Sequence, residues 1–258
     1  MGRGKKPLLE KVEIQKIAAE GKSIAYIDEK VLFVPNTLPG DIVDVQVTRK
    51  RKNFMEGIVT HTHRFSALRI APACTHFGIC GGCKWQNLPY EKQLEFKQQE
   101  IVDNLQRIGK VELQNISPII SSPKTTYYRN KLEYTFCNKR FLTREEIANG
   151  QDIDRTPAVG FHVPGLFDKV IDIKKCYLQA EPSNAVRNFI RDYAIEHEFN
   201  FYDIREQAGF LRTLIIRTSS TGEVMVIVTF GEENKEIYFP HANWHILQDK
   251  GYHERPRC

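Results

Sequence analysis

Three cysteines lie within residues 74–83, where Cys74, Cys80 and Cys83 follow a C-x5-C-x2-C spacing. The glycines among them allow the backbone to turn several side chains toward one point. The C-x2-C pair of Cys80 and Cys83 is a recurring spacing with which proteins hold zinc and iron–sulfur clusters, and Cys74 adds a further thiol. The segment is therefore a candidate metal or iron–sulfur site that needs a fourth ligand.

The fourth ligand has more than one candidate. Cys176 is the best, because Cys137 lies inside an apolar run that is typical of a strand with its thiol in a core. With His76 as a nitrogen ligand the loop could instead form a structural zinc site, and unligated thiols are a further alternative. A disulfide is a weaker interpretation, because the N-terminal residues show no apolar signal segment and a reducing cytosol is expected.

A known family has a similar cysteine segment. The bacterial 23S ribosomal RNA (uracil-5-)-methyltransferase family has a cysteine loop and following helix that resemble CTHFGICGGCKWQNLPYEKQLEFKQQEIVDNLQRIG, residues 74–109. The resemblance covers residues 10–231 in order, through the further stretches GKSIAYIDEKVLFVPNTLPGDIVDVQV, YRNKLEYTF, GFHVPG and LRTLIIRTSSTGEVMVIV. In that family the loop cysteines and one distant cysteine hold a [4Fe–4S] cluster. The resemblance therefore implies the cluster ligands Cys74, Cys80, Cys83 and Cys176.

The resemblance also implies an activity, the methylation of uridine C5 in RNA with S-adenosylmethionine. In the family a cysteine thiolate adds to uracil C6, the activated C5 attacks the methyl group, and a carboxylate base removes the C5 proton. These groups belong to a C-terminal domain with DPPR-like and SCNP-like loops. The chain shows neither motif, so we expect no catalytic residue and no S-adenosylmethionine site in it. Residues 232–258 are expected to be a divergent tail in place of that domain.

Functions from different classes fit these observations. In the first, the chain is the RNA-recognition and cluster-bearing part of such a methyltransferase, with ribosomal RNA as its partner and transfer RNA as the alternative. In the second, it is a stand-alone, non-catalytic RNA-binding module. A third interpretation is a zinc-stabilised protein associated with translation. No protein or membrane partner is expected and the expected location is cytoplasmic, since no run approaches the ~20 apolar residues of a membrane span.

The basic charge of the chain is concentrated near its N-terminus. The 258 residues carry a formal net charge of +5, and residues 1–69 alone hold thirteen Lys/Arg against eight Asp/Glu. The remainder of the chain is therefore balanced. A surface that faces a polyanion such as RNA is expected in the N-terminal part.

Residues 8–64 alternate short apolar strands with turn signals, which predicts a five-stranded OB-like β-barrel. The segment resembles the TRAM domain of RNA-modifying enzymes, and residues 1–68 are taken as this domain. Four basic residues in a row lie between the last two predicted strands: Arg49, Lys50, Arg51 and Lys52. They are candidate contacts to RNA phosphates, and the alternative is a solvated hairpin tip.

Residues 69–231 predict a mixed α/β domain, so that the whole chain is of the α+β class. A helix is expected over residues 89–108, with an apolar stripe that faces a core. Further elements are predicted as strands at 127–139, 158–163 and 169–173, a helix at 182–199 and a hairpin at 209–230. Arg129 and Lys131, beside the first of these strands, are candidate RNA contacts, and the alternative is protection of a sheet edge by charge.

Overall fold

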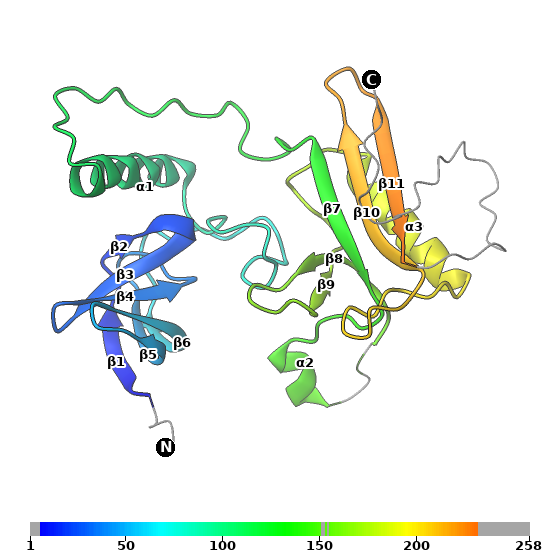
Figure 1. The fold of residues 1–258 in the computed structure, drawn as a ribbon, viewed down its shortest axis with the longest axis horizontal. Helices are drawn as coiled ribbons and strands as arrows, with labels where there is room; N and C mark the ends of the chain where they lie inside the picture. Colours follow the sequence, from blue (N-terminus) through cyan, green and yellow to red (C-terminus); the bar gives the residue numbers. More distant parts are fainter. Residues whose placement is uncertain (1–5, 151–152, 154, 232–258) are drawn as a thin grey trace. The chain divides into compact units, whose positions relative to one another are not determined.

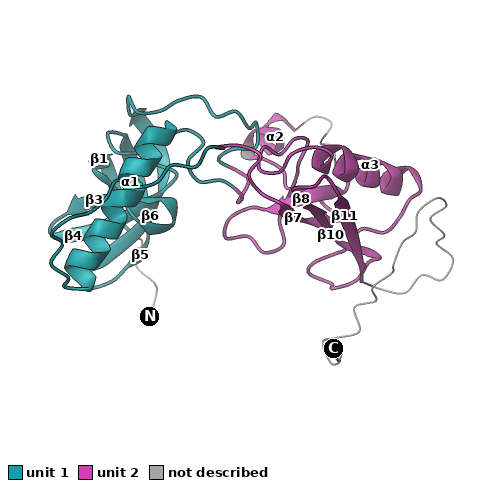
Figure 2. Ribbon diagram, turned by 90° about the horizontal axis from the view of Figure 1, so that it is seen from above, with its two compact units in different colours: residues 1–78, 83–123 teal, residues 79–82, 124–258 magenta. Residues whose placement is uncertain are grey.

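The computed structural model describes residues 6–150, 153 and 155–231. The chain divides into two compact units, which Figure 2 shows in different colours. Unit 1 consists of residues 1–78 and 83–123, and unit 2 consists of residues 79–82 and 124–258. The expected divergence of residues 232–258 lies outside the described residues.

The β-rich part of unit 1 is one sheet of six strands (Figure 1). In chain order the strands are β1 (Leu8–Glu13), β2 (Lys16–Ile17), β3 (Lys22–Ile27), β4 (Lys30–Pro35), β5 (Ile42–Lys50) and β6 (Phe54–Arg64), with the short turn η1 (Ala19–Gly21) before β3. Their order in the sheet is β1-β5-β6-β4-β3-β2. All pairs are antiparallel except β4 with β6, which run parallel.

The core of unit 1 follows the alternation seen in the sequence. In β5, Val43, Val45 and Val47 are buried while the residues between them are partly exposed. These valines pack with apolar residues of the other strands, as expected for a sheet with one covered face. The expected count of five strands is wrong. The strand predicted first in the chain is divided into β1, which pairs with β5, and β2, which pairs with β3. The change of partner falls between Ile14, whose N–H donates to the Asp41 carbonyl, and Gln15, whose N–H donates to the Ile24 carbonyl of β3.

Helix α1 (Tyr90–Asp103) follows the cysteine loop and continues into one π-helical turn, η2 (Asn104–Ile108). The predicted helix is therefore confirmed, with Pro89 directly before its first turn. The prediction that its stripe faces a core is wrong for the described chain, because α1 has no buried residue and Ile101 and Ile108 are 57% and 79% exposed. Helical periodicity identifies an apolar face but not the partner that covers it.

Unit 2 is built on a five-stranded antiparallel sheet of order β11-β10-β7-β8-β9. The strands are β7 (Lys131–Cys137), β8 (Ala158–His162), β9 (Val170–Asp172), β10 (Leu211–Thr218) and β11 (Val224–Phe230), and the helices are α2 (Arg144–Asn149) and α3 (Ser183–Glu196). Every strand and helix predicted for this part is present, with shorter bounds. Helix α2 was not predicted, although Thr143 and Glu146 form a capping box at its start.

Helix α3 lies against one face of this sheet (Figure 1). Leu132, Tyr134 and Phe136 alternate along β7 as buried residues, and the hydroxyl of Tyr134 lies 3.4 Å from that of Ser183 on α3. Lys131 and Glu133 point away from this covered face. The described chain is thus of the α+β class with a β-rich N-terminal region, as predicted. None of its described helices is long and apolar enough to cross a membrane.

Candidate functional site

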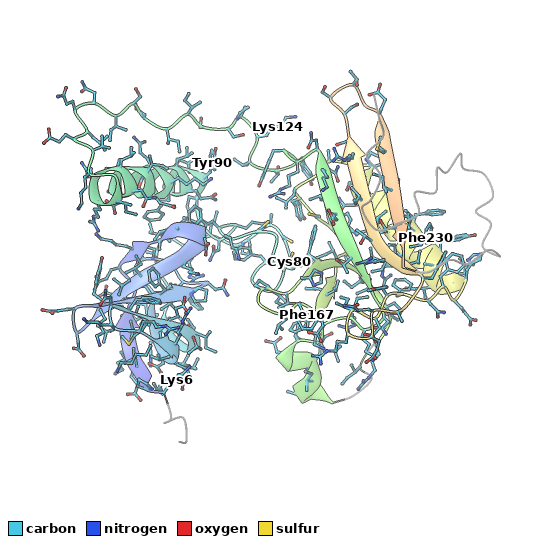
Figure 3. The ribbon with its side chains drawn as sticks, viewed as in Figure 1. Lys6, Cys80, Tyr90, Lys124, Phe167 and Phe230 are labelled. Carbon is cyan, nitrogen blue, oxygen red and sulfur yellow. The ribbon has the colours of Figure 1, made fainter. Side chains whose placement is uncertain are left out.

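The cysteine loop occupies the stretch between β6 and α1, which contains no helix or strand. Cys74 and Cys83 belong to unit 1, whereas Cys80, labelled in Figure 3, and Cys176 belong to unit 2. None of the four forms a disulfide; Cys176 is buried and the other three are partly exposed. The disulfide interpretation thus has no support among the described cysteines.

The two cysteines of unit 1 share one side-chain partner. The Oε1 atom of Gln86 accepts the backbone N–H of Cys74 at 3.1 Å, and its Nε2 atom donates to the sulfur of Cys83 at 3.2 Å. In unit 2 the N–H of Gly82 points at the sulfur of Cys80, 3.4 Å away. Such N–H donors favour the thiolate, the form of cysteine that binds metals.

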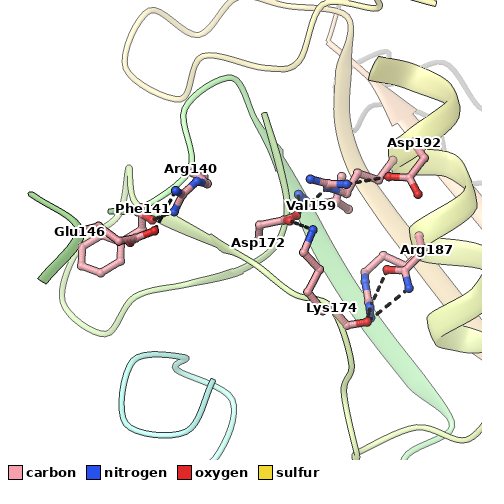
Figure 4. Close-up of polar contacts among 10 residues, drawn as sticks. Arg140, Phe141, Glu146, Val159, Asp172, Lys174, Arg187 and Asp192 are labelled. Carbon is pink, nitrogen blue, oxygen red and sulfur yellow. Dashed lines mark hydrogen bonds and ion pairs between the residues drawn. The ribbon is translucent and has the colours of Figure 1, made fainter. Parts of the chain in front are cut away.

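Cys176 is held by its backbone. Asn184, on α3, accepts the Cys176 N–H at 2.7 Å and donates to the Cys176 carbonyl at 3.1 Å. The guanidinium group of Arg187 donates to Asn184 at 2.9 Å. It also donates to the Lys174 carbonyl at 2.6 Å (Figure 4). Because one amide binds both backbone groups of Cys176, the position of this cysteine is set by α3.

The thiols fit an iron–sulfur cluster in their chemistry, since thiolates that accept N–H donors are the usual ligands of such clusters. Within the described ranges, however, no three His, Cys, Asp or Glu side chains gather closely enough to hold a metal ion. Cys137, set aside as a ligand, is 2% exposed in β7 as predicted, and burial raises the pKa of its thiol. His76, the nitrogen ligand of the zinc alternative, lies in the same loop.

The four basic residues of the N-terminal part lie at the tip of the β5–β6 hairpin. Arg49 and Lys50 end β5, and Arg51 and Lys52 form the turn. Arg49 lies 3.6 Å from the carboxylate of Glu56 and over the ring of Phe54. Lys50, Arg51 and Lys52 are exposed, and no ion pair of theirs is found in the described part of the chain. The hairpin tip therefore presents three cations to solvent, one at the end of β5 and two in the turn.

The two basic candidates of unit 2 lie at the start of β7. Arg129 is exposed, and its N–H donates to the Leu178 carbonyl at 2.8 Å. Lys131 pairs with Glu133 at 3.1 Å and lies beside Arg217 of β10 in the ladder. Although β7 is the central strand of its sheet, its pairing with β8 begins only at Thr135. Protection of an open strand edge therefore stays the alternative explanation of these charges.

A polar clasp in unit 1 was missed by the sequence analysis. Asp41, fully buried, accepts the N–H groups of Leu38 and Ser66, each at 2.7 Å, and both Nε and Nη2 of Arg69. Gly40 precedes it at a φ of +91°, and a side chain there would approach Ser66. Asp41 and Arg69 are 28 positions apart, so no local sequence pattern points to their contact. The clasp joins the turn before β5 to the segment after β6.

The clasp fixes the charge state of Asp41. Burial would raise the pKa of this carboxyl, but the hydrogen bond from Arg69 and those from the backbone of Leu38 and Ser66 outweigh burial and lower the pKa below 3.8. Because the folded pKa lies below the unfolded one, the stabilisation is complete above about pH 4 and is lost as the pH falls through the folded pKa.

Thermal unfolding against pH tests this account. The melting temperature of the wild-type chain is expected to fall steeply below about pH 4, whereas Asp41→Asn should melt lower at pH 7 and lose less on further acidification. If the melting temperatures of both proteins fell equally steeply at acidic pH, Asp41 would not be the cause of the acid destabilisation.

Comparisons with known proteins support the N-terminal assignment. The TRAM domain family model matches residues 10–60, which span β1 to β6 up to Thr60. This segment includes the basic hairpin tip but ends before Arg69 of the clasp.

Sequence relatives extend the similarity beyond the TRAM segment. An uncharacterized RNA methyltransferase of Bacteroides thetaiotaomicron is 55% identical over 212 residues, which are 82% of this chain and 47% of that protein. One from Porphyromonas gingivalis is 50% identical over 225 residues, 85% of this chain and 48% of the relative. The chain therefore spans about half the length of the curated relatives that it matches.

A solved structure agrees with these relatives. The Pyrococcus abyssi tRNA (uracil-54, C5)-methyltransferase in complex with S-adenosyl-L-homocysteine matches with a TM-score of 0.59 and 25% identity, over 87% of this chain and 46% of that one. The chain thus has a TRAM domain near its N-terminus and is similar, along most of its length, to about half of proteins named RNA methyltransferases.

Proposed function

We propose that this chain is the RNA-recognition and cluster-bearing part of a 23S ribosomal RNA (uracil-5-)-methyltransferase. The observation that carries the proposal is the similarity of 82% of the chain to a protein named RNA methyltransferase, beginning with a TRAM domain. The complete enzyme would methylate uridine C5 with S-adenosylmethionine, through residues other than those of the two units. Transfer RNA is the alternative substrate, because the solved structure that matches is a tRNA methyltransferase.

In this proposal, residues 1–68 bind RNA phosphates. Residues 69–231 present a single-stranded RNA segment. The phosphates would be bound by Lys50, Arg51 and Lys52, and the exposure of these residues at the hairpin tip supports this role. The single-stranded segment would be contacted by Arg129 and Lys131, beside the exposed face of the unit 2 sheet. We propose the cytoplasm as the place where the protein meets its RNA.

Cys74, Cys80, Cys83 and Cys176 are the proposed ligands of a [4Fe–4S] cluster. When bound, the cluster would supply a structural cross-link, because four thiolates occupy all the ligand positions of such a cluster. The chain's own contribution is to hold the thiols in place. The contacts of Gln86 with Cys74 and Cys83 and of Asn184 with Cys176 support this role.

A methyl-transfer assay tests the proposed role. The anaerobically purified chain is mixed with ribosomal RNA and S-adenosylmethionine that carries a labelled methyl group. We expect the RNA to be bound and no label to appear at uridine C5. Label at C5 would contradict the assignment of this chain to recognition alone, and failure to bind RNA would contradict recognition itself.

The hairpin tip gives a sharper prediction. In the double variant Arg51→Ala, Lys52→Ala, affinity for single-stranded RNA should fall, because two cations that displace counterions are lost. The slope of log affinity against log salt should flatten by about 1.4, at about 0.7 per phosphate contact. Lys92→Ala is the matched control, because Lys92 is half-buried on α1 and pairs with Glu95 at 2.7 Å. A double variant with the wild-type slope would exclude the tip from the RNA interface.

A further inference from the structure

A hollow in unit 1 lies beside the clasp of Asp41 and Arg69. It has a volume of about 240 Å³ and opens to solvent. Its lining residues come from the turn after β4, from β6 and from the segment that follows: Pro35, Asn36, Thr37, Asp41, Ile58, Val59, Thr62, Phe65 and Arg69. The hollow is smaller than the roughly 300–1,000 Å³ pockets that enclose drug-sized ligands. Its size therefore suits one flat ring system.

Phe65 is the prominent apolar residue of this hollow. Its side chain is 65% exposed, although it lies directly after β6 and next to buried Ser66. Ile58 adds further exposed apolar surface at 46%. An exposed aromatic ring beside an arginine, at the edge of a hollow, is a feature of binding sites for flat ligands.

Arg69 is held rigidly next to Phe65. Its Nε and Nη2 atoms donate to the buried carboxylate of Asp41, and Nη2 also reaches the Asn36 carbonyl at 3.4 Å. The centre of the guanidinium group lies 5.1 Å from the centroid of the Phe65 ring. Among the described residues no partner is found for Nη1 of Arg69. The side chain therefore keeps a donor for a ligand while its orientation is fixed.

We propose that this hollow binds one unstacked nucleobase of single-stranded RNA, with Phe65 as the stacking surface and Arg69 as the adjoining cation and donor. The proposal rests on the proposed function as an RNA-recognition part and adds a site within it. Bases that leave a helix stack on aromatic rings and on guanidinium planes, and their edges take hydrogen bonds. Asn36 and Thr62 supply polar groups in the same hollow.

The test uses two fluorescent probes, an octamer of uridylate and an abasic octamer with the same ribose–phosphate backbone. The wild-type chain should bind the uridylate octamer more tightly, and Phe65→Leu should lose about 5- to 100-fold for this probe only, as expected for the loss of one base–aromatic stack. Phe65→Trp should keep the affinity, and its emission should be quenched by uridylate and not by the abasic probe.

Tyr26→Leu is the matched control, because Tyr26 is an exposed aromatic residue on β3 that does not line the hollow. It should bind both probes like the wild type. A Phe65→Leu chain that still discriminates between the probes, or a loss as large in Tyr26→Leu, would overturn the proposed base site. Failure of the wild-type chain to bind either octamer would overturn the proposed function as well.

Discussion

Replacing Cys176 by serine is expected to remove most of the iron, about four atoms per chain for one [4Fe–4S] cluster, from protein purified without oxygen. The soluble yield should fall together with the iron content. The reason is that the serine hydroxyl is a poor replacement for a thiolate ligand, and that binding of a structural metal group stabilises the folded chain. Iron and sulfide analysis and the visible absorption of the purified protein measure the result.

Cys137→Ser is the control for this experiment. Cys137 is as buried as Cys176 but lies inside β7, where its thiol donates to the Lys139 carbonyl at 3.2 Å, a bond that a hydroxyl can also make. This variant should keep the wild-type iron content. Equal iron in Cys176→Ser and wild type would remove Cys176 from the ligand set. Zinc in place of iron in the wild-type protein would favour the zinc alternative.

Arg187→Ala is expected to lower the free energy of unfolding by about 3 kcal/mol, because it removes a buried cation that several groups depend on. Arg187 is fully buried, lies over the Tyr134 ring at 5.2 Å, and donates to the Lys174 carbonyl and to Asn184. Its loss takes one of two donors from each acceptor, since Asn184 keeps the Cys176 N–H and the Lys174 carbonyl keeps Asn188, and it leaves a cavity between α3 and β7. Urea denaturation, followed by the far-ultraviolet circular dichroism signal, measures the change.

Two further variants complete this test. Arg187→Lys keeps the positive charge but lacks the planar guanidinium group with its several donors. It should therefore recover only part of the stability. Arg217→Ala removes an exposed arginine of β10 and should change the unfolding free energy by no more than about 0.5 kcal/mol. If Arg187→Ala were as stable as Arg217→Ala, the buried contacts of Arg187 would not contribute to the fold.

Much of the secondary structure could be predicted because its signals are local. The alternation of Val43, Val45 and Val47 identifies β5 and its buried face, and the β-branched runs on either side of Gly222 identify β10 and β11. The basic hairpin tip follows from the same pattern. Each of these features depends on residues that are neighbours along the chain.

The features that could not be predicted depend on residues distant in sequence. Asp41 and Arg69 are 28 positions apart, and nothing local shows that one carboxylate binds the turn, Ser66 and a guanidinium group together. The role of Asn184 is similar, because its contact with Cys176 requires α3 to lie beside the preceding loop. The exposure of the α1 stripe was also unpredictable, since a helix pattern says nothing about its partner.

The most direct test of the central claim is a competition between single-stranded and duplex RNA for the purified chain. A labelled, uridine-containing fragment of ribosomal RNA is displaced by the same unlabelled sequence, either alone or annealed to its complement. The account predicts that the single strand competes at least about tenfold better, because its unstacked bases can reach aromatic side chains. Equal competition by the duplex, or no binding of the labelled fragment at low salt, would contradict recognition of single-stranded RNA.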